Sequence, residues 1–370
     1  MASIDKRPNG KFRARWREHP GGPQLTKSFD RKMDAERHLV AVQHAILSGT
    51  YLTPESARLT VEDYYRSTWL PRMKPAWRSG TQATVEVSFD RHVLPILGKR
   101  PLTAVRRADI ESFAAGLKLA PSTVAVVVQH AGQMFNGAID DGLLKTRNPT
   151  YRARLPKNEG RKVQPVPLEV VARVEAALPD WLKVAVSLGV GAGLRQGELS
   201  GLSVDRIEFL RRTVRVDRQL ISRNVPQPVL GPVKTASSNR TVPLAAVVLT
   251  ALSEHLRAFP AENDQLLLRT PAGEPVDADK FGNPWRTAVK KAGAPGLRYH
   301  DLRHTFASTL LSRGVSVKAV ADWLGHASPV ITLNTYAHLM PADEDVARSV
   351  LDEALSQPAE DSLRTGTDPS

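Results

Sequence analysis

Near its C-terminal end the chain contains His300-Asp301-Leu302-Arg303-His304, followed by Leu324-Gly325-His326 and then by Tyr336. These residue types suit attack on a phosphodiester, which needs an oxygen nucleophile, positive charge around the phosphorus and an acid for the departing oxygen. A tyrosine has an unperturbed pKa of about 10, so it needs basic or cationic neighbours before it releases its proton. The stretch therefore holds, within a short distance along the chain, the residue types that phosphoryl transfer requires.

Further upstream, an arginine and a lysine stand in contexts that suit the same reaction. Arg195 lies in Gly193-Leu194-Arg195-Gln196-Gly197-Glu198-Leu199, and Lys234 lies in a turn rich in Pro, Ser and Asn. A guanidinium donates two parallel hydrogen bonds to phosphate oxygens, which an ammonium cannot do. We therefore predict that Arg195 and Arg303 bind the phosphate. The alternatives are an ion pair of Arg195 with Glu198 and a solvated surface charge at Lys234.

The order and spacing of these motifs resemble those of the tyrosine recombinases of the phage integrase family. The resemblance implies six catalytic residues, which are Arg195, Lys234, His300, Arg303, His326 and Tyr336. It implies that Arg195 and Arg303 clamp the transition state while Tyr336 forms a 3′-phosphotyrosyl intermediate. It also implies that His300 assists proton transfer at the tyrosine and that His326 donates a hydrogen bond to the scissile phosphate. Lys234, on a β-hairpin, would be the general acid for the leaving 5′ oxygen.

The composition of the chain indicates the class of partner. Its 370 residues carry 51 Lys and Arg against 38 Asp and Glu, a net charge of +13, which favours a polyanion such as DNA over a merely solvated basic surface. The chain has no cysteine, which excludes disulfides, a Cys nucleophile and a Cys-ligated metal site. It has no apolar run of about 18 residues and no apolar segment at its start. These absences predict no membrane partner, and the resemblance implies a cytoplasmic protein of a bacterial host, nucleoid-associated when active.

Residues 1–55 are predicted to form a small domain of strands and one helix that binds arm-type DNA sites. Residues 12–17 alternate apolar and basic side chains, which places Arg13, Arg15 and Arg17 on one face of a strand. Asp30 is predicted to cap the helix that follows. A basic β-ribbon backed by a helix suits a DNA groove, and the alternative is an edge strand kept soluble by its arginines. The unit resembles the arm-binding domain of many phage and integrative-element integrases.

The remaining segments complete a multidomain fold that is mainly α with small β elements. Residues 58–155 are predicted to form an all-α core-binding domain, in which Pro71 ends the first helix. Residues 166–355 are predicted to form a mixed α/β catalytic domain of the tyrosine recombinase type, and 356–370 a disordered tail. An amphipathic helix is expected from Asp343 to Leu355, docked either on a neighbouring protomer or on its own chain.

The resemblance implies site-specific DNA recombination, the integration and excision of a phage or integrative element. It implies a homotetramer on double-stranded DNA attachment sites, working without cofactor or metal, and brings a DNA-bending host factor and an excision factor into consideration. Three alternatives are kept beside it. His300 and His304 have the spacing of two metal ligands in His-Glu-x-x-His, which would suit a metal-dependent nuclease. The others are a non-catalytic DNA-binding regulator on the same fold and a type IB topoisomerase-like activity.

Overall fold

The computed structural model describes residues 2–157, 163–222, 225, 227–262 and 265–340, together with 348, 349, 351–353 and 355. The chain divides into two compact units, one before and one after the gap at 158–162. The described residues are mainly helical with small antiparallel sheets, which confirms the predicted fold class. No helix among the described residues is long and apolar enough to cross a membrane.

The first unit begins with a sheet in the order β1 (Ser3–Lys6), β2 (Phe12–Trp16) and β3 (Leu25–Phe29), backed by helix α1 (Lys32–Leu47). Ala14 and Trp16 of β2 are buried in a core with the apolar positions of α1, as the alternating sequence predicts. Helix α1 starts one residue later than predicted, because its N-cap residue is Arg31 and not Asp30. The assignment of Asp30 as cap is wrong, because its carboxylate pairs with Lys11 at 3.1 Å instead.

Two helices of the first unit contain π turns where each meets a proline. One helix runs through α3 (Val61–Tyr64), a π turn at Tyr65–Trp69 and α4 (Leu70–Met73). The other runs through α5 (Ser79–Ser88), a π turn at Phe89–Val93 and α6 (Leu94–Leu97). Pro71 and Pro95 follow directly, and the wider turn relieves the clash of a proline ring with the preceding carbonyl. The prediction that Pro71 ends the first helix is therefore wrong.

An aromatic stack joins these two helices at their π turns. The rings of Tyr65 and Phe89 lie 3.9 Å apart, centre to centre, with planes inclined by only 11°. Helices α7 (Arg107–Gly116) and α8 (Pro121–Asp140) complete this apolar core, with α2 (Pro54–Arg58) leading into it. This core and that of the N-terminal sheet share no buried residue among those described.

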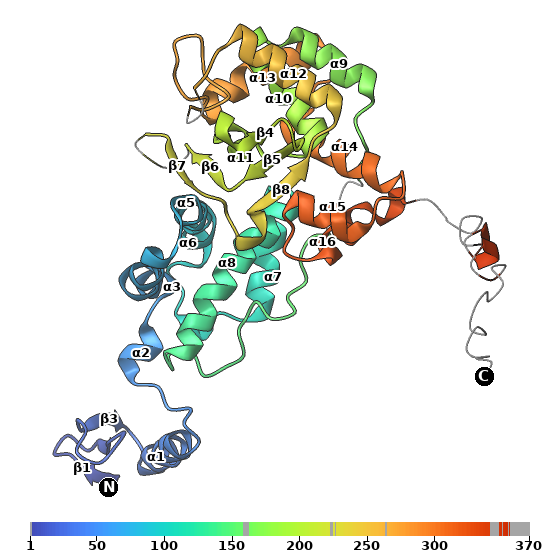
Figure 1. Ribbon diagram of the computed structural model, residues 1–370. Coiled ribbons are helices and arrows are strands. Elements are labelled where there is room, and N and C mark those ends of the chain that lie inside the picture. Colours follow the sequence, from blue (N-terminus) through green and yellow to red (C-terminus); the bar gives the residue numbers. More distant parts are fainter. Residues whose placement is uncertain are drawn as a thin grey trace, which may run out of the picture. The chain divides into compact units, whose positions relative to one another are not determined.

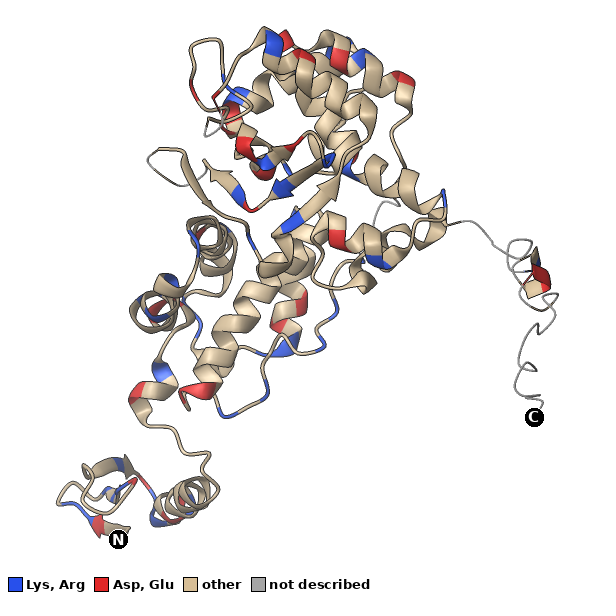
Figure 2. Ribbon diagram, in the orientation of Figure 1, with Lys and Arg blue, Asp and Glu red and all other residues tan. Residues whose placement is uncertain are grey.

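The second unit surrounds α10 (Asp180–Ala192), which packs against α14 (Tyr299–Leu311), α12 (Ala246–Ala258) and α9 (Leu168–Ala177) (Figure 1). Its remaining helices are α11 (Gln196–Ser200), α13 (Ala278–Lys291), α15 (Val317–Leu324) and α16 (Pro329–Tyr336). One sheet has the order β4 (Ile207–Glu208), β5 (Thr213–Val216) and β8 (Arg240–Pro243), and β6 (Arg218–Ile221) pairs with β7 (Val229–Pro232) in a hairpin. Basic positions lie along β5, β6 and β8, with acidic residues interspersed over the unit (Figure 2).

Gly193 ends α10 in the left-handed conformation, with φ of +61°. A Cβ at this position would lie 2.6 Å from the ring of Phe306 on α14, so only glycine allows the chain to turn this close to α14. The turn places Arg195 at the start of α11, as the sequence predicts.

At the C-terminal end of the chain, the predicted tail at 356–370 and most of the helix predicted from Asp343 lie outside the described residues.

Candidate active site

Arg303 lies on the face of α14 that turns inward, and only 2% of its surface is exposed. Its guanidinium donates hydrogen bonds to the carbonyl of Gly193, at 2.6 Å, and to that of Leu324. Burial and the nearby charge of Arg195 lower the pKa of Arg303, but a guanidinium with two carbonyl acceptors remains charged at neutral pH. Arg303 is therefore a fixed cation between the end of α10 and the end of α15.

Arg195 is held by the carboxylate of Glu198, one turn further along α11. One guanidinium nitrogen lies 2.7 Å from Oε1 and the backbone N–H lies 2.9 Å from Oε2. Burial raises the pKa of Glu198, but hydrogen bonds and charge from Arg240, and the charge of Arg195, lower it to about 2. The structural ion pair considered for Arg195 thus exists, and 35% of the arginine side chain still remains exposed to a substrate.

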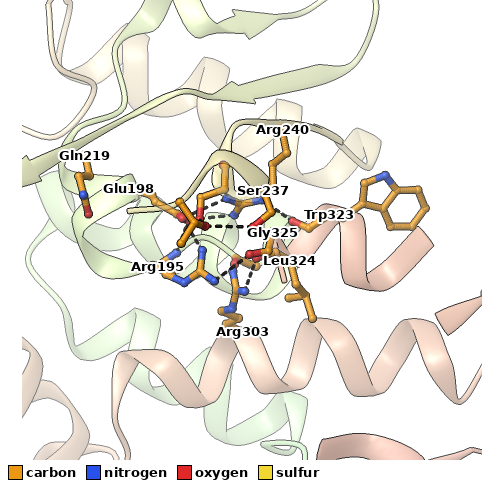
Figure 3. A network of polar contacts seen from close by, with 12 residues as sticks. Arg195, Glu198, Gln219, Ser237, Arg240, Arg303, Trp323, Leu324 and Gly325 are labelled. Atoms are coloured by element: carbon orange, nitrogen blue, oxygen red, sulfur yellow. Dashed lines mark hydrogen bonds and ion pairs between the residues drawn. The ribbon is translucent and has the colours of Figure 1, made fainter. Parts of the chain in front are cut away.

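The C-terminal end of α15 collects the guanidinium groups of this region (Figure 3). Three successive carbonyls each accept a hydrogen bond from a different arginine: Trp323 from Arg240, Leu324 from Arg303 and Gly325 from Arg195. The last carbonyls of a helix lack partners within the helix and carry the negative end of its dipole. The end of α15 therefore offsets the mutual repulsion of three like charges.

We predict that Gly325→Ala destabilises the fold at this point. Gly325 has φ of +63°, and an added Cβ would lie 3.0 Å from both the carbonyl oxygen of Ser237 and the Cα of Ser238. The left-handed conformation alone costs a residue with a Cβ about 1–2 kcal/mol, and the backbone contacts add to that. Urea unfolding measures the loss. Gly314→Ala is the matched control, because Gly314 also has positive φ, +80°, but has open space around it. Equal losses in the two variants would contradict the close packing at Gly325.

Tyr336 lies at the end of α16 with 2% of its surface exposed. Its hydroxyl is 2.7 Å from Nδ1 of His304. Burial raises the pKa of Tyr336 to about 12, although the charge of Arg303 opposes this effect. Burial lowers the pKa of His304, so its ring is neutral at pH 7 and Nδ1 can accept the hydroxyl proton.

The sequence reasoning missed the role of His304, which it considered only as a metal ligand. The signal was available in the helical period, because residues 300, 303 and 304 share one face of a helix. His300 is exposed, and within the described chain it has no hydrogen-bond partner. Its ring packs edge-on against that of His304, with the ring centres 4.8 Å apart.

His326 follows the end of α15 and is anchored to the helix that carries Tyr336. Its Nδ1 lies 2.7 Å from the hydroxyl of Thr332, a fully buried residue one turn before Tyr336. Burial, followed by the charges of Arg303 and Arg195, lowers the pKa of His326 to about 4. If Thr332 donates to Nδ1, the neutral ring carries its proton on Nε2, where it can be donated to a phosphate.

We predict that His326 makes the stability of the fold depend on pH. Its pKa is about 4 in the folded chain, against about 6.5 for an unperturbed histidine. Between these two pH values the unfolded chain binds a proton at this histidine and the folded chain does not. The free energy of unfolding is therefore highest above pH 6.5 and falls as the pH drops towards 4. The thermal midpoint measured between pH 7 and 5 is expected to fall more for the wild type than for His326→Asn. Parallel curves would contradict this assignment.

Lys234 lies between β7 and β8, beyond the β6–β7 hairpin. Its side chain is exposed, and no hydrogen bond or ion pair ties it to the part of the chain that the structure describes.

In the N-terminal sheet, Arg13 and Arg15 both pair with Asp5, each at 2.8 Å, while the exposed Arg17 donates to the carbonyl of Gly22. Among the described residues, no group of three or more His, Asp or Glu is placed to hold a metal ion.

Comparisons with known proteins place this site in a family context. Residues 168–342 match the model of the phage integrase family, and residues 60–118 match that of the phage integrase N-terminal SAM-like domain. The chain is 30% identical to a tyrosine recombinase XerC-like protein of Caldanaerobacter subterraneus, over 59% of this chain and 63% of that protein, less than two thirds of its length. It is 25% identical to the integrase of Mycobacterium phage D29, over 87% of this chain and 88% of that integrase.

A solved structure with a similar fold is that of the Tn1549 transposon integrase in complex with a circular intermediate DNA. The TM-score is 0.69 at 23% identity, covering 80% of this chain and 99% of that one. At this identity the likeness concerns the fold alone.

Proposed function

Because this chain belongs to the phage integrase family of tyrosine recombinases, we propose that it integrates and excises a phage or other integrative element at specific DNA sites. The observation that carries the proposal is the hydrogen bond between the hydroxyl of Tyr336 and the neutral ring of His304. His304 lies on α14 beside the fixed cation Arg303, and α14 packs against the helix that carries Tyr336. Type IB topoisomerase-like or purely regulatory activity has no observation in its favour.

The proposed cleavage step assigns each group a role. The hydroxyl of Tyr336 attacks the scissile phosphorus and passes its proton to Nδ1 of His304, while His300, packed edge-on against that ring, assists the transfer. Arg195 and Arg303 neutralise the phosphate oxygens as charge builds in the transition state. His326 donates a hydrogen bond to one of them from Nε2.

The leaving group and the rejoining step complete the exchange. Lys234, exposed on the segment between β7 and β8, protonates the 5′ oxygen as its bond to phosphorus breaks. The tyrosine then carries the 3′ phosphate in an ester bond. A 5′ hydroxyl of the partner DNA attacks that ester and releases the tyrosine, so the bond energy is conserved without a nucleotide.

We further propose that the protein acts as a homotetramer on paired attachment sites in the cytoplasm of a bacterial host, at the nucleoid. Residues 1–55 would bind arm-type sites, 58–155 core sites, and 166–355 would carry the chemistry. The separate apolar cores of the N-terminal sheet and of the following helices support the first of these divisions. A DNA-bending host factor and an excision factor are the further partners to test.

The test of this function uses DNA that flanks the gene, nicked near the candidate cleavage site so that the short product diffuses away. The protein is incubated with this DNA in EDTA and analysed on a denaturing gel. A covalent protein–DNA adduct that forms in EDTA supports the proposal and excludes the metal-dependent nuclease. Tight binding to the attachment-site fragment with no adduct, across flanking fragments, would favour the regulator instead.

Deleting residues 1–50 is expected to spare cleavage at a core site and to impair integration between two separate DNA molecules. The reason is that the deleted sheet has its own apolar core, apart from that of the following helices. Integration is measured by recombinant product and cleavage by adduct. The triple variant Arg13→Ala, Arg15→Ala, Arg17→Ala is the matched control, since it removes the charges without removing the unit. Equal integration by the truncated and full chains would contradict an arm-binding role.

A further inference from the structure

We propose that Arg240, which lies outside the six residues assigned to catalysis, is a positioning residue that sets the geometry of Arg195 and His326. The proposal rests on the proposed strand-cleavage function and adds a residue to it. Arg240 begins β8 and is 8% exposed, so it is too deeply placed to contact DNA itself. Its effect must pass through the groups it touches, which are shown in Figure 3.

The first of these groups is the carboxylate of Glu198. Two guanidinium nitrogens of Arg240 lie 3.0 and 2.9 Å from Oε1 and Oε2, a two-point contact that fixes the plane of the carboxylate. The same two oxygens hold the backbone and the guanidinium of Arg195. Glu198 is buried, with 4% of its surface exposed, and Arg240 is the residue that contacts both of its oxygens through side-chain nitrogens. Loss of Arg240 would therefore free the carboxylate to rotate and would change the direction of the Arg195 guanidinium.

The remaining contacts of Arg240 reach two other parts of the site. Its Nε lies 2.5 Å from the carbonyl of Trp323, three residues before His326. A terminal nitrogen lies 3.0 Å from the carbonyl of Ser238, in the segment that carries Lys234. Arg240 thereby connects α11, the end of α15 and the segment before β8 through one planar group.

A purely stabilising role explains this arrangement less well. Replacing a buried ion pair by apolar residues is often neutral for stability, whereas a planar fork fixes directions that a point charge cannot. Arg240 stands in Ser238-Asn239-Arg240-Thr241-Val242-Pro243-Leu244, the context by which Lys234 is chosen from the sequence. Its own partner, Glu198, is 42 residues away, so its contact with the site is seen only in the fold.

The test compares Arg240→Lys with wild type on the DNA that forms the adduct, once with the natural phosphodiester and once with a methylphosphonate at the scissile position. Lysine keeps the charge and loses the fork. A methylphosphonate lacks one negative charge and so depends less on a correctly placed Arg195. Arg206→Lys is the matched control, because Arg206 also pairs with carboxylates of this unit, those of Asp205 and Asp217, but lies outside the network.

Arg240→Lys is expected to cleave the phosphodiester roughly ten- to hundredfold more slowly, the scale of a misplaced catalytic group. The defect should shrink markedly on the methylphosphonate, as it should for Arg195→Ala, while Arg206→Lys cleaves both substrates normally. Wild-type rates in Arg240→Lys, or an equal defect on both substrates, would overturn the proposal.

A second variant covers the case in which Arg240→Lys does not fold. Glu198→Gln with Arg240→Met removes both buried charges together, and it should fold while retaining the selective defect on the phosphodiester. An unimpaired double variant would overturn the proposal. A wild-type chain that forms no adduct overturns the proposed function itself, so the two failures are distinguishable.

Discussion

Tyr336→Phe is expected to bind attachment-site DNA as the wild type does and to form no covalent adduct. The substitution removes only the attacking oxygen, and the ring keeps its place in a site that is 2% exposed. The lost hydrogen bond to Nδ1 of His304 costs about 1 kcal/mol, a small change beside the loss of the nucleophile. A gel-shift titration measures binding, and a denaturing gel of the nicked substrate measures the adduct.

Tyr299→Phe is the matched control for this variant. Tyr299 begins α14 beside His300, and its buried hydroxyl has no hydrogen-bond partner within the described chain. Removing an unsatisfied buried hydroxyl should leave the fold and the adduct yield unchanged. An adduct that persists in Tyr336→Phe, or that disappears in both variants, would remove the nucleophile assignment.

Arg303→Ala is expected to lower the single-turnover cleavage rate by roughly a hundredfold or more, the scale of removing a group that stabilises an oxyanion. It should also destabilise the second unit. The side chain is 2% exposed, and its loss leaves the buried carbonyls of Gly193 and Leu324 without their donor. Each such group costs about 1–3 kcal/mol.

Arg195→Ala separates the two effects of Arg303. Arg195 is the more exposed arginine, and Glu198 keeps Arg240 as its partner when Arg195 is lost. A comparable loss of rate with a much smaller loss of stability is therefore expected, measured by cleavage and by urea unfolding of both variants. Normal cleavage by either variant would refute the phosphate-binding role of that arginine.

The sequence predicted what depends on local order. The motifs around Arg195, Arg303 and His326, and the inward face of β2, are patterns of neighbouring residues, and the structure places Arg195 at a helix start and Ala14 in a core as expected. Pairing between residues that are distant in the sequence could not be predicted in this way. Asp30 is a residue type that often caps helices, and only the fold shows that Lys11 lies beside its carboxylate.

The same reason explains what the sequence left out of the site. His304 acquires its role from a tyrosine 32 residues away, and Arg240 acquires its role from Glu198 and the end of α15. Pro71 was misjudged because the π turn at Tyr65–Trp69 accommodates its ring and lets the helix continue to Met73. The helical period places His304 on the same face as Arg303, but it does not name the tyrosine that His304 contacts.

The paired π turns of the first unit constrain how this chain can gain or lose residues. A π turn amounts to one extra residue inserted in an α-helix, and one residue turns a helix by about 100°. Deleting a residue at Tyr65–Trp69 alone would rotate everything after it, and would separate the stacked rings that join the two helices. The second helix carries the same one-residue insertion at Phe89–Val93, so the side chains after the two π turns are rotated by the same angle and continue to face each other. In a lineage of such chains, the two insertions should be inherited or lost together.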